Sequence, residues 1–244
     1  MAERMDDIGF GGLKLIQEPE EFCYGVDAVI LADFAAKYAS GKPKSIVDLG
    51  TGTGIIPLIL SHKTQADLIA GVELQQASYE RACRNAEMNQ LQERIHFFHS
   101  DVKEAAGGKL AVLKGSADVV TTNPPYMPSL GGLTNANSAK AIARHETSAG
   151  LEDFFACAAA LLKPRGDLFM VHRPSRLADI CCFARQYGLE PKRLCFVSPN
   201  ARKAPNIILV HCVKGGGREL RLLEPLYVYK EDGSYTEELR SCYL

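Results

Sequence analysis

Hydrophobic and polar positions along this chain form two kinds of segment. Short apolar runs flanked by glycine or polar residues predict buried strands. Longer segments with apolar residues three and four positions apart predict helices. The predicted strands lie at residues 45–49, 68–73, 95–98, 117–122, 167–171, 195–197 and 207–211. The predicted helices lie at residues 26–39, from about residue 53, and at 75–89, 151–162 and 177–187.

The order of these segments predicts the fold class. Strands and helices alternate, which is typical of a doubly wound, mostly parallel α/β sheet. Only residues 198–206 separate the last two strands, which leaves room for a hairpin but not for a crossover helix. We therefore expect a seven-stranded sheet with one antiparallel strand near the C-terminus. Ligands of such sheets bind at the carboxyl ends of the strands, so candidate functional residues are expected there.

A glycine-rich turn follows the first predicted strand, with the sequence DLGTGTG at residues 48–54. Glycines let the backbone approach a ligand closely, and the helix N-terminus behind them offers free N–H groups. The dinucleotide motif G-x-G-x-x-G places its third glycine one residue later. The pattern here suits S-adenosylmethionine, with its ammonium group near Asp48, while a dinucleotide site and a plain strand–helix turn remain alternatives. The candidate cofactor contacts are Asp48, Gly50, Thr51, Gly52 and Gly54.

Carboxylates follow the second and third predicted strands. Glu73 ends the second strand, where a carboxylate can accept hydrogen bonds from both ribose hydroxyls of a nucleoside. Asp101, followed by Val102, comes after the third strand, where it can accept from the exocyclic amine of an adenine. Each carboxylate alone is typical of a protein surface. Their placement after consecutive strands suits an adenosine ligand, and Glu73, Asp101 and Val102 join the candidate cofactor contacts.

The sequence Asn123-Pro124-Pro125-Tyr126 follows the fourth predicted strand. Prolines fix the backbone and have no N–H for strand pairing, which directs the carbonyls of Asn123 and Pro124 into the crevice. Two acceptors on one planar –NH2 group hold both hydrogens and turn the nitrogen lone pair toward an electrophile. Tyr126 supplies a flat face on which a base can stack. We expect Asn123, Pro124 and Tyr126 to be catalytic, Asn123 also to border the cofactor, and Pro125 and Tyr126 to contact the substrate.

A long polar segment, residues 127–150, follows this motif. A long loop at the carboxyl end of a strand is more often a lid or a substrate loop than a simple connection. We expect its Arg144 and His145 to contact the substrate. The other histidines lie on predicted helices or strands and are interpreted as structural.

Composition excludes several classes of protein. Of 244 residues, 46% are hydrophobic and 23% charged, as in ordinary globular proteins. The eight cysteines form no C-x-x-C pair and no cysteine/histidine cluster, so no metal site is expected. No apolar segment approaches the ~20 residues that a membrane span needs. The N-terminus has no signal-peptide pattern, so a cytoplasmic location is expected.

Charge is distributed unevenly, although the net charge is only −1. Residues 163–221 contain 12 Lys/Arg and four Asp/Glu, a net charge of +8, and the segments on both sides are acidic. Such a stretch can form a basic face for a polyanion, although scattered surface charges would give the same count. Arg173, Arg202 and Lys203 are the candidates for binding phosphates of an RNA substrate.

Together, these motifs resemble the class I S-adenosylmethionine-dependent methyltransferases that modify amino groups and carry an Asn-Pro-Pro-Tyr motif. Residues 24–34, Arg173-Pro174 and residues 214–216 resemble more narrowly the bacterial tRNA(Val) adenine N6-methyltransferase family. The resemblance covers almost the whole chain. It implies a Rossmann-like methyltransferase fold, S-adenosylmethionine as cofactor, and N6-methylation of the adenine just 3′ of the anticodon in a tRNA.

The resemblance also implies a domain organisation and partners. We expect one methyltransferase domain, with a cofactor-covering extension at residues 1–44, a catalytic core at 45–214 and a C-terminal tail at 215–244. In that family the N-terminal segment closes over the cofactor, which implies this role for Tyr24, Gly25 and Asp27. We expect an RNA substrate, no membrane association, no obligate protein partner, and a monomer or weak homodimer.

Other functions remain open from the sequence. Release-factor glutamine methyltransferases use the same motif on an amide, but carry a helical substrate domain before the cofactor motif, and we expect residues 1–47 to leave no room for one. Methylation of ribosomal RNA guanine or of DNA adenine needs the same amine chemistry. A non-catalytic RNA-binding module on this fold is the alternative outside enzymes, and the intact motif at residues 123–126 argues against it.

Overall fold

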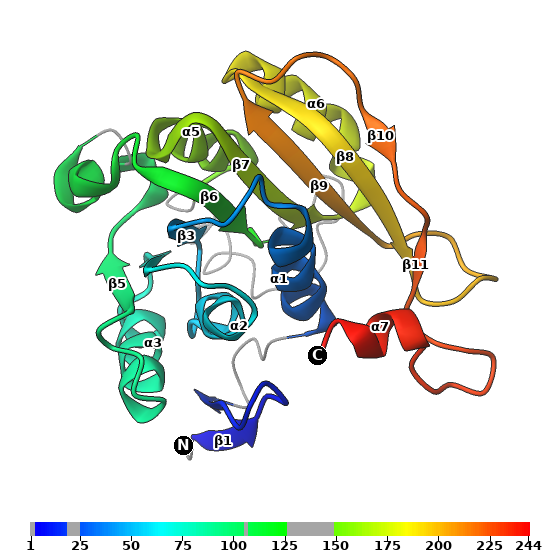
Figure 1. Ribbon diagram of the computed structural model, residues 1–244, viewed down its shortest axis with the longest axis horizontal. Coiled ribbons are helices and arrows are strands. Elements are labelled where there is room, and N and C mark those ends of the chain that lie inside the picture. The colour runs from blue at the N-terminus through cyan, green and yellow to red at the C-terminus, as the bar shows by residue number, and fades with distance from the viewer. Residues whose placement is uncertain (1–2, 19–24, 105–106, 126–148) are drawn as a thin grey trace, which may run out of the picture.

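The predicted strands form one central sheet in the computed structural model of the protein, which describes residues 3–18, 25–104, 107–125 and 149–244 (Figure 1). Its strands are β3 (Ser45–Leu49), β4 (Leu68–Glu73), β5 (Ile95–His99), β6 (Ala117–Thr122), β7 (Leu162–His172), β8 (Leu189–Ser198), β9 (Ile207–Lys214), β10 (Arg221–Leu222) and β11 (Leu226–Tyr227). Within the described residues the sheet has nine strands in the order β10-β8-β9-β7-β6-β3-β4-β5, with β11 also paired to β8.

Helices cover both faces of this sheet. They are α1 (Val26–Tyr38), α2 (Ile55–Lys63), α3 (Gln76–Met88), α5 (Leu151–Leu161) and α6 (Leu177–Gln186). The first three pack on one face and the last two on the other (Figure 1). Successive strand residues alternate between the two cores, as with Ile46 under α1 and α2 and Val47 under α5. The doubly wound α/β prediction is therefore confirmed.

One central strand runs against the others. The strands β3 to β7 pair in parallel with one another, whereas β9 is antiparallel to both β7 and β8. The predicted antiparallel strand is confirmed, and it lies inside the sheet between β7 and β8. The short strands β10 and β11, which the sequence pattern did not predict, extend the sheet beyond β8 and run parallel to it.

Helix α1 runs from the carboxyl edge of the sheet to the amino edge. Ser40, just after the helix, donates its backbone N–H to Asp167 Oδ2 at 2.7 Å. Asp167 begins the part of β7 that pairs regularly with β6 and β9, and His211 Nε2 lies 2.8 Å from its Oδ1. A helix of this length spans about 20 Å. Gly25 and Asp27, at its other end, therefore lie toward the carboxyl edge.

Two peripheral elements were not predicted from the sequence. A hairpin of β1 (Arg4–Asp7) and β2 (Lys14–Gln17) precedes the first helix, and the short helix α7 (Glu237–Ser241) lies near the C-terminus (Figure 1). The hairpin loop contacts the C-terminal segment, because the rings of Phe10 and Tyr243 stack with their centroids 5.7 Å apart. The β1 sequence RMDD lacks apolar alternation, which explains why the pattern did not indicate a strand.

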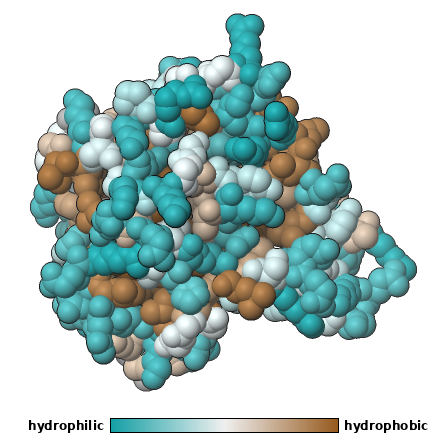
Figure 2. All heavy atoms as spheres, viewed as in Figure 1, coloured by the Kyte–Doolittle hydropathy of each residue, from teal (hydrophilic) through white to brown (hydrophobic). Residues whose placement is uncertain are grey.

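The face of the molecule shown in Figure 2 is mainly polar. Hydrophilic side chains predominate on the face shown in Figure 2, and hydrophobic side chains form small groups among them. In the described parts of the chain, no helix is long and apolar enough to cross a membrane.

Candidate active site

The glycine-rich turn lies between the end of β3 and the start of α2. Gly50, Gly52 and Gly54 have φ angles of +70°, +58° and +84°, a left-handed conformation that favours glycine. The backbone N–H groups of Gly50 and Thr51 donate to Val72 O at 2.9 and 3.0 Å. The predicted turn therefore forms, and it lies against the carboxyl end of β4.

Asp48 is fully buried behind this turn, with 0% of its surface exposed. Thr121 donates its hydroxyl to Asp48 Oδ1 at 2.7 Å. Among the described residues, Asp48 Oδ2 and Thr51 Oγ1 have no hydrogen-bond partner, which is unusual for buried polar atoms. Burial raises the pKa of Asp48 from 3.8 to about 7, against the opposing effects of the Thr121 hydroxyl and the nearby Thr51 hydroxyl. A cation near Oδ2 would favour the carboxylate form, so this environment fits the ammonium group of S-adenosylmethionine.

The Glu73 carboxylate holds the turn from the neighbouring strand. Its Oε2 accepts the backbone N–H of Gly52 at 2.8 Å, and its Oε1 accepts that of Gln75 at 2.8 Å. A carboxylate offers about four lone-pair positions. Each Glu73 oxygen therefore keeps the capacity to accept a further hydrogen bond, such as one from a ribose hydroxyl.

Asp101 lies beside Glu73, after the end of β5. The backbone N–H of Ser100 donates to Glu73 O at 3.1 Å, which joins the two strand ends. Asp101 Oδ1 accepts the backbone N–H of Lys103 at 2.9 Å, at the start of the 3-10 helix that includes the buried Val102. The two predicted carboxylates therefore lie at the ends of adjacent strands.

The predicted catalytic motif starts directly after β6. Thr122 pairs with Leu49 of β3 and donates its hydroxyl to Leu49 O at 3.0 Å. Of the residues that follow, Asn123 is half-buried, Pro124 is buried and Pro125 is exposed. The motif thus begins at the level where the glycine-rich turn begins, and the candidate amine acceptors and the candidate cofactor turn lie on neighbouring strands.

The other predicted contacts are only partly within the described residues. Gly25 is exposed at the N-cap of α1, and Asp27 is half-buried in the first turn of this helix. Tyr24, Tyr126, Arg144 and His145, with most of the loop at 127–150, lie outside the described residues. Their roles stay predictions.

The three candidate phosphate contacts lie at the carboxyl edge. Arg173 follows β7, while Arg202 and Lys203 lie in the turn after β8, which runs parallel to β7. All three are exposed. Arg202 forms a 2.5 Å ion pair with Glu231, but both side chains are about 80% exposed. Such exposed pairs contribute little to stability, so a phosphate can compete for Arg202.

Some cations of the basic segment stabilise the fold instead. Lys214 Nζ donates to the backbone carbonyls of Ala159 and Leu162, both at 2.6 Å. Arg193 lies 2.9 Å from His211 Nδ1, and its guanidinium lies 5.0 Å from the centre of the Tyr38 ring. The net charge of residues 163–221 therefore overstates the surface that can bind phosphates.

Two residues near the site have contacts that the sequence pattern did not reveal. Thr121, opposite Asp48 in the sheet, fixes one oxygen of that carboxyl group. His172 ends β7, is 4% exposed, and accepts the backbone N–H of Arg173 on Nδ1 at 2.8 Å. Burial, with the nearby Arg176, lowers the pKa of His172 from 6.5 to about 4, so its ring is neutral at pH 7. In the sequence, the sign that His172 lies near the site was its position directly after the predicted strand at residues 167–171.

Comparisons with known protein families all identify methyltransferases as relatives of this chain. Residues 26–179 match the model of the methyltransferase small domain. A tRNA1(Val) (adenine(37)-N6)-methyltransferase of Porphyromonas gingivalis is 31% identical over 188 residues, which cover 76% of this chain and 72% of that protein. A protein of the same description from Dyadobacter fermentans is 30% identical over 208 residues, covering 82% of each chain.

Solved structures give the same result for the fold. A predicted O-methyltransferase from Agrobacterium tumefaciens superimposes with a TM-score of 0.70 at 22% identity, covering 89% of this chain and 95% of that one. TYW2 of Pyrococcus horikoshii, crystallised with MeSAdo, superimposes with a TM-score of 0.57 at 14% identity, covering 84% and 70%. At these identities the similarity establishes the fold alone.

Proposed function

Because the chain belongs to the methyltransferase small domain family and to the family of tRNA1(Val) (adenine(37)-N6)-methyltransferases, we propose that it methylates N6 of an unpaired adenine next to the anticodon of a tRNA. The methyl donor in this proposal is S-adenosylmethionine. The observation that carries it is the position of the Asn123–Pro125 motif beside the glycine-rich turn, on neighbouring strands of the sheet.

The cofactor is held by the glycine-rich turn and the strand-end carboxylates in this proposal. S-adenosylmethionine supplies an electrophilic methyl group on a cationic sulfonium. Glu73 accepts from the ribose hydroxyls, and Asp101 accepts from the adenine amine with Val102 nearby. Asp48 and Thr51 supply acceptors for the ammonium group, and their unpartnered buried oxygens among the described residues support a cation there.

The target amine is oriented by the motif after β6. Asn123 and the carbonyl of Pro124 accept its two hydrogens, and Tyr126 stacks on the adenine ring. Because an aromatic amine is a weak base, we expect positioning and exclusion of water to supply most of the rate enhancement. The same acceptors bind the amine more strongly as it becomes cationic, which stabilises the transition state.

The tRNA is bound at the carboxyl edge. Arg173, Arg202 and Lys203 contact phosphates, and Arg144 and His145 contact nucleotides near the target. An adenine in a tRNA loop is already unpaired, which lowers the cost of moving it into the pocket. The turn after β8, which contains Arg202 and Lys203, projects at the right of Figure 1.

The organisation of the whole protein completes the proposal. Residues 1–44 act as a cofactor-covering extension in which Tyr24, Gly25 and Asp27 lie over the ligand. Residues 45–214 form the catalytic core, and residues 215–244 form the tail. We expect a cytoplasmic protein that works as a monomer or weak homodimer with no obligate protein partner.

Transfer of tritiated methyl groups to total RNA tests this function. The RNA is taken from cells that lack the protein, and the modified nucleoside is identified and mapped. The proposal predicts labelled N6-methyladenosine in the tRNA fraction. Label in ribosomal RNA guanosine, DNA or a protein glutamine would replace the proposed substrate, and no transfer to any of these would favour a non-catalytic RNA-binding module.

A further inference from the structure

Asn85 of α3 and Asn89, the C-cap residue of this helix, pair with the edge of the N-terminal hairpin. Asn89 accepts the backbone N–H of Lys14 on Oδ1 at 2.9 Å and donates from Nδ2 to Lys14 O at 2.7 Å. Asn85 makes the same pair of contacts with Ile16, at 2.7 and 3.2 Å. Four helical residues rise about 6 Å and two strand residues about 6.7 Å, so the two spacings match. The side-chain amides thus replace a neighbouring strand.

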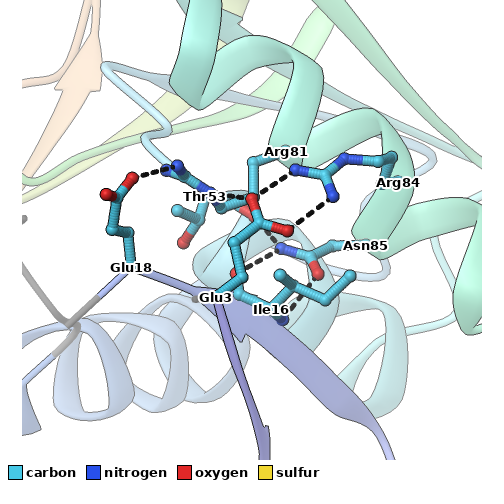
Figure 3. A network of polar contacts seen from close by, with 7 residues as sticks. All are labelled: Glu3, Ile16, Glu18, Thr53, Arg81, Arg84 and Asn85. Carbon is cyan, nitrogen blue, oxygen red and sulfur yellow. Dashed lines mark hydrogen bonds and ion pairs between the residues drawn. The ribbon is translucent and has the colours of Figure 1, made fainter. Parts of the chain in front are cut away.

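Asn85 also contacts the glycine-rich turn. Its Nδ2 donates to the backbone carbonyl of Thr53 at 2.9 Å, as Figure 3 shows. Thr53 lies between Gly52 and Gly54, both with positive φ angles. Glycines restrict the backbone least, so the peptide groups around Thr53 are easily rotated without such a contact. The Asn85 side chain is 0% exposed, which makes the loss of its hydrogen bonds costly.

Ion pairs fix the hairpin on the same helix. Arg84 donates to Glu3 Oε2 at 2.7 Å, and Arg81 donates to Glu18 Oε2 at 3.0 Å (Figure 3). The hydrogen bond from Arg84, with a second from Arg81, lowers the pKa of Glu3 from 4.5 to about 2. Arg81 is only 4% exposed. The ion pairs therefore hold the open end of the hairpin, next to the paired residues Arg4 and Gln17, and the hairpin covers the buried amide of Asn85.

We propose that Asn85 is a positioning residue for the cofactor: it fixes the Thr53 carbonyl, and thereby the turn at residues 50–54, while the hairpin keeps its amide in place. The inference rests on the proposed function, since the turn is the candidate cofactor site. A turn held in its binding conformation loses less conformational entropy when the ligand binds. The hairpin, far from the reacting amine, thus contributes to cofactor affinity through Asn85.

Calorimetric titration of the full-length protein with S-adenosylhomocysteine tests the role of Asn85. Asn85→Asp keeps the shape and the acceptor for the Ile16 N–H but removes the donors to Thr53 O and Ile16 O, and Asn85→Ala removes all three hydrogen bonds. Asn89→Ala is the matched control, because Asn89 pairs with the hairpin in the same way and has no hydrogen bond to the turn among the described residues. Thermal unfolding of each variant establishes that it is folded at the temperature of the titration.

We expect both Asn85 variants to weaken binding about 10-fold, the effect of losing the hydrogen bond that fixes the turn, and Asn89→Ala to change it less than about twofold. The KM for S-adenosylmethionine should rise likewise, while kcat and the KM for tRNA stay nearly unchanged. A folded Asn85→Asp variant that binds like the wild type would overturn the proposal, as would an equal loss in Asn89→Ala. Failure of the wild type itself to bind would instead refute the proposed cofactor.

Discussion

The chemistry of Asp48 depends strongly on its surroundings. Its carboxyl group is buried behind the glycine-rich turn, receives the Thr121 hydroxyl on one oxygen, and has a pKa raised to about 7 by burial. An unfolded chain ionises this group near pH 3.8. Folding therefore favours the protonated form, and the stability that this provides is present at low pH and is lost as the pH rises toward and through 7.

Asp48→Asn should remove this pH dependence, because the amide cannot ionise. We expect the free energy of unfolding of the wild type to fall, relative to the variant, between pH 5 and pH 7.5. Denaturant unfolding of both proteins at the two pH values measures the difference. Parallel stability curves would contradict the assigned burial effect. His172 has a folded-state pKa of about 4, below its ordinary value of 6.5, so it adds an opposite pH dependence of its own, but this is the same in both proteins and cancels in their difference.

The residues that follow a predicted strand could be identified from the sequence. Asp48, Glu73, Asp101 and Asn123 each lie at or near the end of an apolar run, and parallel strands bring such ends to one edge. The role of Thr121 could not be predicted, because it depends on the register between β6 and β3. The two hydrogen bonds that Glu73 accepts from backbone N–H groups could not be predicted either, because they form only in the folded turn.

At the scale of elements, the glycine-rich turn is restricted both by its conformation and by its neighbours. A Cβ atom at Gly54 would lie 2.7 Å from Cζ of Phe97 and 3.4 Å from Cβ of Ala82. Gly54 is also left-handed, with a φ of +84°. Gly188, which follows α6 with a φ of +70°, has no atom within 4 Å of such a Cβ in the described structure.

Replacing these two glycines separates backbone strain from close packing. Gly188→Ala should lower the free energy of unfolding by about 1–2 kcal/mol, the cost of a left-handed alanine. Gly54→Ala should lower it by roughly 2–4 kcal/mol, because displacement of the Phe97 ring is added. Urea unfolding gives both values. Equal losses in the two variants would mean that Phe97 moves without cost and that packing does not restrict the turn.

The central strands and helices were predictable because their apolar periodicity is strong and local. The hairpin was not, since its strand Arg4–Asp7 is polar and its contacts come from Asn85 and Asn89, far along the chain. The position of β9 inside the sheet, between β7 and β8, could not be predicted from the sequence either. A hairpin loop fixes the direction of two strands relative to each other, but not their place in the sheet.

At the scale of the whole molecule, the basic segment divides into two groups of cations. Lys214 and Arg193 contact buried carbonyls and rings, whereas Arg202 and Lys203 are exposed in the turn after β8. Arg218 is also exposed, but it lies near the start of β8, at the opposite edge from the candidate active site. RNA binding should depend on the edge at which a cation lies and not on charge alone.

Charge reversal at the two edges tests this dependence. The double variant Arg202→Glu and Lys203→Glu should weaken tRNA binding and reduce the slope of log K against log salt by about 2, roughly one per lost phosphate contact. Arg218→Glu should leave the slope nearly unchanged. Fluorescence titration at several salt concentrations measures both. A wild-type affinity that does not change with salt would exclude an RNA substrate held by phosphate contacts.

The most direct test of the account is a single-turnover reaction of the wild type and Asn123→Ala with unmodified tRNA, with the nucleoside products resolved by mass. Asn123 is expected to stabilise the amine mainly as it becomes cationic, so its loss should reduce kcat more than it raises KM. We predict N6-methyladenosine from the wild type and a rate about 10²–10³ lower from the variant. Methyl groups on a ring carbon, on a ribose oxygen or only on protein would contradict the account, as would an undiminished rate in Asn123→Ala.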